Sequence, residues 1–156
     1  MSKFKPIPTG FHTITPYLSV TDADAAIKFY QQVFGAEEVG RITMGGDTVG
    51  HAELQIGDSK LMLAQEMPDW GNKSPRTLGG SPVTIALYVA DVDATFQRAL
   101  DAGATVVEAV KDQFYGDRAG SLTDPFGHKW HILSHIEDVS FDEMQRRCDA
   151  MMTAGN

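Results

Sequence analysis

The sequence predicts an α+β protein in which one βαβββ module occurs twice and a C-terminal helix follows. The segment LSVTDADA at residues 18–25 is matched by LYVADVDA at residues 87–94. Each copy is followed by a helical pattern and then by three strand-like runs, which indicates a duplicated module. We expect a single domain over residues 1–156, with modules at residues 13–65 and 83–135, an irregular linker at 66–82 and a C-terminal helix at 140–152.

Turn residues and hydrophobic periodicity define the first module. Asp22 is a typical helix N-cap after a predicted strand at residues 15–20, and Gly35 is a typical helix end. The apolar residues between them recur at the helical period, which predicts a helix over 23–34. Gly-Gly-Asp and Gly-Asp turns then separate three predicted strands, at residues 38–44, 49–56 and 60–65.

The second module repeats this order, with Asp91 as the N-cap of a helix over 92–102 and Gly103 after it. Residues 112–118 are expected to form a loop rich in aromatic and charged side chains. The turn at residues 124–127, Asp-Pro-Phe-Gly, combines a proline with a glycine that can adopt positive φ. The strands of this module are predicted at residues 84–89, 105–110, 120–123 and 129–134.

Composition excludes several classes of protein. The 156 residues carry a formal net charge of −8, which disfavours nucleic-acid binding because phosphate contacts need a basic surface. No apolar run approaches about 18 residues and the N-terminus has no apolar signal region, so we expect a cytoplasmic protein with no membrane partner. Cys148 is the single cysteine and forms no intramolecular disulfide. Nucleotide-binding glycine motifs and G-x-S-x-G are absent from the sequence.

The paired modules, each opening with a strand and V-x-D-x-x-A, resemble the vicinal oxygen chelate superfamily. That superfamily includes glyoxalase I, extradiol dioxygenases, and the bleomycin and fosfomycin resistance proteins. The resemblance covers residues 12–147 and implies that each module curls its mixed sheet into a half-barrel. The segments that are similar to the PhnB-like branch are HAEL at 51–54, GDS at 57–59, LGGSP at 78–82, DQFYGDR at 112–118 and DPFGHKW at 124–130.

The resemblance also implies metal ligands on the opening and last strands of each module. The corresponding positions here are Thr15, Thr84, His131, and Leu61 or Met62. At most one of the four, His131, suits a divalent ion, because a hydroxyl is a poor neutral ligand and Leu61 and Met62 are apolar. A catalytic site usually needs three protein ligands. We therefore expect the standard metal site to be absent or rebuilt. A divalent metal in a nonstandard site built from His51, Glu53 and His131 is the alternative, and the cofactor stays open.

The candidate ligand-binding residues are His51, Glu53, Tyr115, Arg118 and His131. His51 and Glu53 share one face of a strand, roughly 6–7 Å apart by the strand rise. His131 occupies the cavity-facing position that the resemblance implies and is the candidate general base, because imidazole titrates near neutrality. Arg118 can offer a planar fork to a carboxylate or phosphonate; the alternative is an Asp–Arg pair within the loop that rigidifies the turn.

Two function classes follow. One is a protein that binds a small oxygenated or anionic metabolite in a half-barrel pocket, as bleomycin resistance proteins do. The other is a lyase, isomerase or dioxygenase with a nonstandard metal site, so whether the chain is an enzyme stays open. Open half-barrels expose sheet edges, and the resemblance therefore implies a homodimer. Trp130 is expected in the core, whereas Trp70 could close a pocket or pack under a loop.

Overall fold

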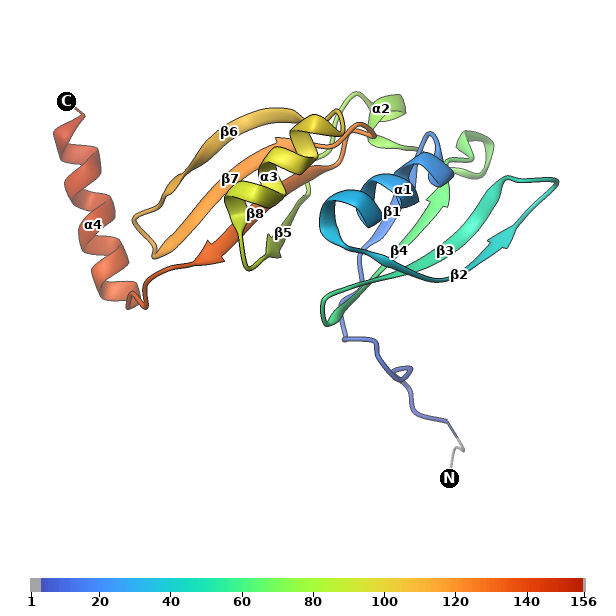
Figure 1. Cartoon of the computed structure of the whole chain (residues 1–156), viewed down its shortest axis with the longest axis horizontal. Helices are drawn as coiled ribbons and strands as arrows, with labels where there is room; N and C mark the ends of the chain where they lie inside the picture. The colour runs from blue at the N-terminus through green and yellow to red at the C-terminus, as the bar shows by residue number, and fades with distance from the viewer. Residues whose placement is uncertain (1–3, 156) are drawn as a thin grey trace. The chain divides into compact units, whose positions relative to one another are not determined.

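The computed structural model describes residues 4–155 and has the predicted fold class, with two four-stranded mixed sheets and a C-terminal helix (Figure 1). The chain forms two compact units. Pro125–His128 groups with the first unit, although the rest of the second module forms the other. No helix within residues 4–155 has the length and apolar character needed to cross a membrane.

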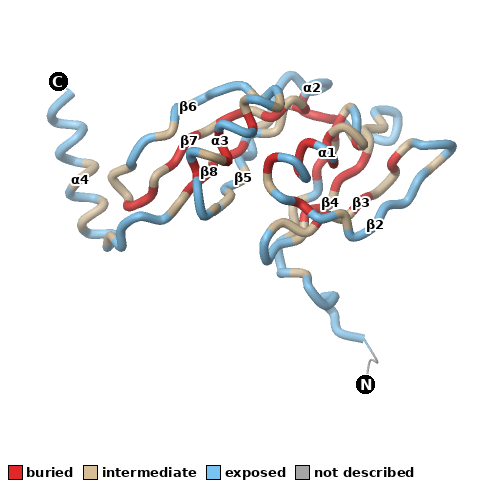
Figure 2. Tube along the Cα trace, in the orientation of Figure 1, coloured by how far each residue is buried: buried red, intermediate tan, exposed pale blue. Residues whose placement is uncertain are grey.

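The first unit contains a sheet of order β1-β4-β3-β2, in which β1 is parallel to β4 and the other neighbours are antiparallel. Asp22 caps α1 by accepting the amide of Ala25, and Gly35 ends it in a left-handed conformation. The helix follows β1 and covers one face of the sheet, where the buried apolar residues lie (Figure 2). The elements of the first unit are β1 Tyr17–Val20, α1 Ala23–Phe34, β2 Glu37–Thr43, β3 Val49–Ile56 and β4 Ser59–Gln65.

The linker, predicted to be irregular, contains two short helical segments, η1 Pro68–Trp70 and α2 Pro75–Leu78. Both begin at a proline, whose fixed φ suits the first helical position. Buried Ser74 caps α2, and the Glu66 carboxylate accepts the Ser74 amide at 2.8 Å. Local capping therefore orders a segment that lacks hydrophobic periodicity. Trp70 is 76% exposed, so it packs under no loop within its unit.

The turn Pro125–His128 packs within the first unit. Phe126 is buried, with its ring edge-on to those of Phe29 and Tyr30 at centroid distances of 6.1 and 6.3 Å. The Pro125 carbonyl accepts Nε of Arg76 at 2.8 Å. The turn thus has a packing role besides reversing the chain.

The second unit repeats the topology with the order β5-β8-β7-β6. Asp91 caps α3 as Asp22 caps α1. Trp130 is 1% exposed, which confirms its predicted core position, and its indole N–H donates to the Asp124 carboxylate at 2.9 Å. The elements of the second unit are β5 Thr84–Tyr88, α3 Val92–Asp101, β6 Thr105–Asp112, β7 Asp117–Thr123, β8 Lys129–His135 and α4 Phe141–Ala154.

The largest difference from the predicted boundaries in this unit is the start of β7, predicted at residue 120 and observed at Asp117. Asp117 and Arg118 are predicted to lie in a loop, but both belong to the strand, and residues 113–116 form the loop between β6 and β7. The antiparallel ladder between β7 and β8 continues to the pair Asp117–His135, and this pairing extends the strand past the residues that strand propensity favours. None of the residues of α4 is buried, so this helix lies on the surface of its unit (Figure 2).

Candidate functional site

The face of the second sheet opposite α3 carries a group of polar side chains around His131. Side chains alternate along a strand, so buried Trp130 and Ile132 face the core while His131 points the other way. His131 lies opposite Ser121 in the ladder, and its Nδ1 is 2.8 Å from the Ser121 hydroxyl. Its Nε2 is 3.1 Å from the hydroxyl of Tyr115. Two hydroxyl groups therefore fix the orientation of this half-buried imidazole.

The loop between β6 and β7 supplies Tyr115. Burial raises the pKa of its phenol, and the nearby carboxylates of Asp117 and Glu108 raise it further. The phenol therefore stays protonated around neutral pH and can donate a hydrogen bond. A neutral imidazole has one donor and one acceptor nitrogen, and both face hydroxyls here, so a ligand would use the remaining donor and acceptor positions of Tyr115 and Ser121. The site can bind oxygen atoms and could transfer a proton.

A second polar group, which the sequence analysis does not predict, lies on the same face of the sheet as His131. The Asp117 side chain is only 7% exposed. Its carboxylate accepts the Tyr88 hydroxyl at 2.9 Å and Nδ1 of His135 at 2.7 Å. Nε2 of His135 lies 2.9 Å from Asp138, so both nitrogens face carboxylates. Hydrogen bonds to Asp138 and Asp117 raise the pKa of His135 and favour its imidazolium form.

Arg118 lies on the opposite side of the sheet from His131. Its Nε and Nη2 donate to the carboxylate of Asp93 in α3 at 2.7 and 2.8 Å, and Nη1 donates to Asp112 at 2.9 Å. The alternative of an Asp–Arg pair within residues 112–118 is therefore met by Asp112, whereas Asp117 points to the opposite face because adjacent strand residues alternate. The guanidinium joins α3 to the edge of the sheet.

In the first unit, His51 and Glu53 lie on the face of β3 that points away from α1. The Nε2 of His51 is 3.5 Å from the Glu53 carboxylate, and its Nδ1 is 2.9 Å from the hydroxyl of Tyr17. These His51 and Glu53 side chains are 28% and 30% exposed. The predicted pair is therefore in contact, and Tyr17 is an addition that pairing of β1 with β4 brings into the same face. Each unit thus holds one histidine against a tyrosine hydroxyl.

Comparison with known proteins assigns the family. Residues 10–132 match the model of the Glyoxalase/Bleomycin resistance protein/Dioxygenase superfamily. The chain belongs to this superfamily. Uncharacterized protein Rv0887c of Mycobacterium tuberculosis is 49% identical over 135 residues, which cover 85% of this chain and 79% of that protein. Uncharacterized protein At5g48480 of Arabidopsis thaliana is 30% identical over 127 residues, covering 76% of this chain and 74% of that protein.

Several solved structures share the fold of this chain. The Arabidopsis At5g48480 protein aligns with a TM-score of 0.63 at 30% identity, over 79% of this chain and 98% of that one. TioX from Micromonospora sp. ML1 aligns with a TM-score of 0.62 at 27% identity, over 80% and 99% of the two chains. FosX from Listeria monocytogenes, in complex with Mn(II) and sulfate, is 16% identical with a TM-score of 0.63, over 87% and 96%. At that identity FosX shows the fold alone.

The residues at the metal positions implied for the superfamily do not form a suitable donor set. Strand register makes Met62 the counterpart of His131, because each lies in the last strand of its module opposite the same position of the first strand. A thioether and the two threonine hydroxyls at Thr15 and Thr84 are poor ligands for a hard divalent ion. Within residues 4–155, no group of three or more His, Cys, Asp or Glu side chains could hold a metal.

Proposed function

We propose that this superfamily member binds a small oxygenated metabolite on the face of the second sheet that carries His131. The observation that supports this most directly is the half-buried imidazole of His131, held between the hydroxyls of Tyr115 and Ser121. Pre-oriented donors and acceptors on a partly apolar surface are what a small-molecule site requires. Carbonyl, hydroxyl or carboxylate oxygens are the ligand groups that match them.

The expectation of an anionic ligand rests on Arg118, but that guanidinium is already paired with two carboxylates. The neutral donors Tyr115 and Ser121 therefore favour an oxygen-rich ligand over a strongly charged one. His51 and Glu53 form a second polar pair in the first unit, and we include them in the proposed binding residues. The motif segments 51–54 and 124–130 support membership of the PhnB-like branch.

A binding screen tests this function. Ligand-observed NMR and thermal shift would be run with a panel of hydroxy acids, keto acids, phosphonates and neutral polyols. For any compound that binds, we expect His131→Ala to weaken affinity by about tenfold or more and Tyr115→Phe by about threefold or more, from the usual value of one hydrogen bond. The exposed α3 residue Gln97 provides the control variant Gln97→Ala, which should bind normally. Compounds that bind all three variants equally would place the site elsewhere.

His51→Ala in the same screen reports on the first unit. A compound whose binding weakens in His51→Ala but not in His131→Ala would show that the first unit has a binding face of its own. Unchanged binding in His51→Ala would restrict the site to the second sheet. The two variants therefore separate binding at the first sheet from binding at the second.

We also propose that the chain forms a homodimer. Apolar side chains on the surface helix α4 support this, since Phe141, Met151 and Met152 are 87%, 60% and 72% exposed in the single chain. Light scattering after size-exclusion chromatography should give twice the 17.0 kDa mass of one chain. A mass of one chain at micromolar concentration would contradict the proposal.

A further inference from the structure

The loop of residues 113–116 determines where Tyr115 lies, and its own turn contains few hydrogen bonds. The Gln113 amide donates to the Asp117 carbonyl at 2.8 Å, and the Gly116 amide donates to the Gln113 carbonyl at 3.2 Å. These bonds close the hairpin between β6 and β7. They involve neither the amide nor the carbonyl of Tyr115, so contacts with other segments must orient that residue.

The first such contact joins the loop to the segment after β8. The Gly116 carbonyl accepts the amides of both Ile136 and Glu137, each at 2.9 Å. Gly116 has φ +93°, and a Cβ atom there would lie 2.2 Å from the Glu137 carbonyl oxygen. The two backbones therefore touch, and a displacement of residues 136–137 would displace the loop.

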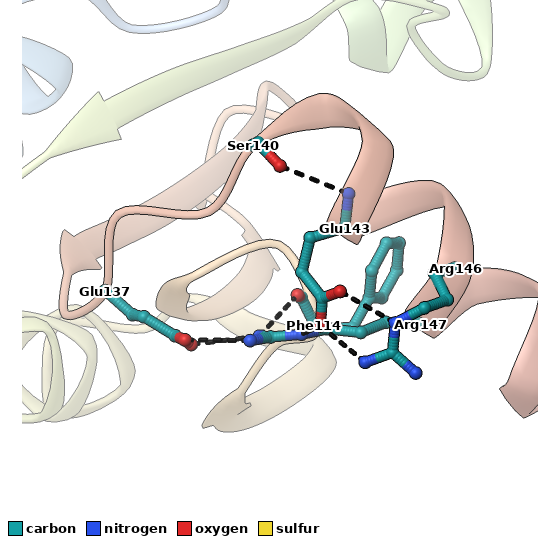
Figure 3. Close-up of polar contacts among 6 residues, drawn as sticks. All are labelled: Phe114, Glu137, Ser140, Glu143, Arg146 and Arg147. Atoms are coloured by element: carbon teal, nitrogen blue, oxygen red, sulfur yellow. Dashed lines mark hydrogen bonds and ion pairs between the residues drawn. The ribbon is translucent and has the colours of Figure 1, made fainter.

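The second contact comes from α4. Arg147 donates through Nη1 to the Phe114 carbonyl at 3.2 Å, and its Nη1 and Nη2 bind the Glu137 carboxylate at 2.9 and 2.7 Å (Figure 3). Its Nε donates to Glu143 at 2.8 Å. A guanidinium is planar, so carboxylates on two of its edges fix the plane and aim the remaining N–H at the carbonyl.

This carbonyl is coupled directly to Tyr115. The Phe114 C=O and the Tyr115 N–H belong to one planar peptide unit, so holding the carbonyl sets the orientation of the following residue. The Phe114 ring also lies edge-on to the Tyr115 ring at 5.3 Å and 83°. The Tyr115 hydroxyl then reaches His131 at 3.1 Å. A continuous set of contacts leads from Arg147 to the imidazole.

We propose that Arg147 is a positioning residue for the Tyr115–His131 pair, and that the C-terminal helix thereby controls the candidate binding face. The consequence of this positioning for ligand affinity rests on the proposed function. The positioning itself can be tested in the ligand-free protein, so it can fail while the binding proposal stands, and the reverse is also true.

Arg146 provides the matched control. Both arginines lie on α4 and both pair with Glu143, Arg146 through Nε and Nη2 at 2.7 Å each. The structure gives Arg147 the contacts with Glu137 and Phe114, whereas Arg146 has the more exposed side chain, 71% against 29%. Arg146→Gln and Arg147→Gln thus remove the same charge from the same helix but differ in their effect on the loop.

The experiment records the ring ¹⁵N and ¹H resonances of His131 by NMR in the full-length, ligand-free chain. Tyr115→Phe removes the hydroxyl and defines the change that loss of the contact produces. We expect Arg147→Gln to shift the same resonances in the same direction, Arg146→Gln to leave them unchanged, and the double variant Tyr115→Phe/Arg147→Gln to add nothing to Tyr115→Phe. A global loss of stability alone would not reproduce the Tyr115→Phe signature.

Amide exchange gives a second, independent measurement. The Ile136 and Glu137 amides should exchange about threefold or more faster in Arg147→Gln than in Arg146→Gln, because their acceptor Gly116 loses its support. Glu137→Gln, which weakens the carboxylate that orients Arg147, should shift His131 in the same direction and serves if Arg147→Gln does not fold. Unshifted His131 resonances in the folded variant, or additive shifts in the double variant, would overturn the proposal.

Discussion

Replacing Gly116 by alanine should be among the most destabilising single-methyl additions in the second unit. Its φ of +93° lies where a side chain costs about 1–2 kcal/mol. The new Cβ would also lie 2.2 Å from the Glu137 carbonyl oxygen, where 3.4 Å or more is ordinary, so one backbone must retreat by about 1 Å. Overpacking of this kind costs about 1–3 kcal/mol, which gives a total of about 2–5 kcal/mol.

Gly46→Ala separates the two contributions. Gly46 has φ +86°, and a Cβ there meets no atom within 4 Å, so only the conformational cost of about 1–2 kcal/mol applies. Urea unfolding of Gly116→Ala can be followed through Trp130 fluorescence in a Trp70→Phe background, which leaves one tryptophan. Far-UV circular dichroism follows Gly46→Ala. Equal losses for the two variants would refute the close contact between Gly116 and Glu137, and with it the coupling of the loop to the segment after β8.

Two further predictions concern ionisation and helix capping. The pKa of His135 is raised from its ordinary 6.5 by Asp138 and Asp117. The contribution of the protonated imidazole to the stability of the folded chain is therefore fully present below pH 6.5 and is lost as pH rises through the folded-state pKa. The stability lost in His135→Gln should therefore be larger at pH 6 than at pH 8.5, and equal losses in urea unfolding at both would contradict this. Asp22→Ala and Asp91→Ala should each cost about 1 kcal/mol, measured the same way, because each removes an N-cap acceptor.

Local signals in the sequence predict the scaffold closely. The N-caps Asp22 and Asp91 fix the starts of α1 and α3, and both helices begin at the residues predicted, 23 and 92. These signals depend on neighbours within four residues, which is why they can be identified without tertiary information. The alternation of Trp130 and His131 likewise assigns one to the core and the other to the opposite face.

The missed contacts join segments that are far apart in sequence. Arg118 binds Asp93, 25 residues earlier, because α3 packs back over β7, and no spacing rule encodes that approach. The Asp117–His135 pair was accessible in principle. The hairpin turn at 124–127 fixes its register, and the same register that places Ser121 opposite His131 also places Asp117 opposite His135. The prediction lacks this pair because it places Asp117 in a loop and not in the strand.

The duplication explains why the scaffold is easier to predict than the site. Register equates Leu54 with Leu122 and Leu63 with Ile132 on the helix-facing sides, where burial against a helix demands apolar side chains in both modules.

On the opposite faces, Glu53 corresponds to Ser121 and Met62 to His131, so equivalent positions carry different chemistry. No core packing constrains these side chains to match. The first module therefore obtains its histidine from β3 and the second from β8, and each reaches a tyrosine hydroxyl by a different route.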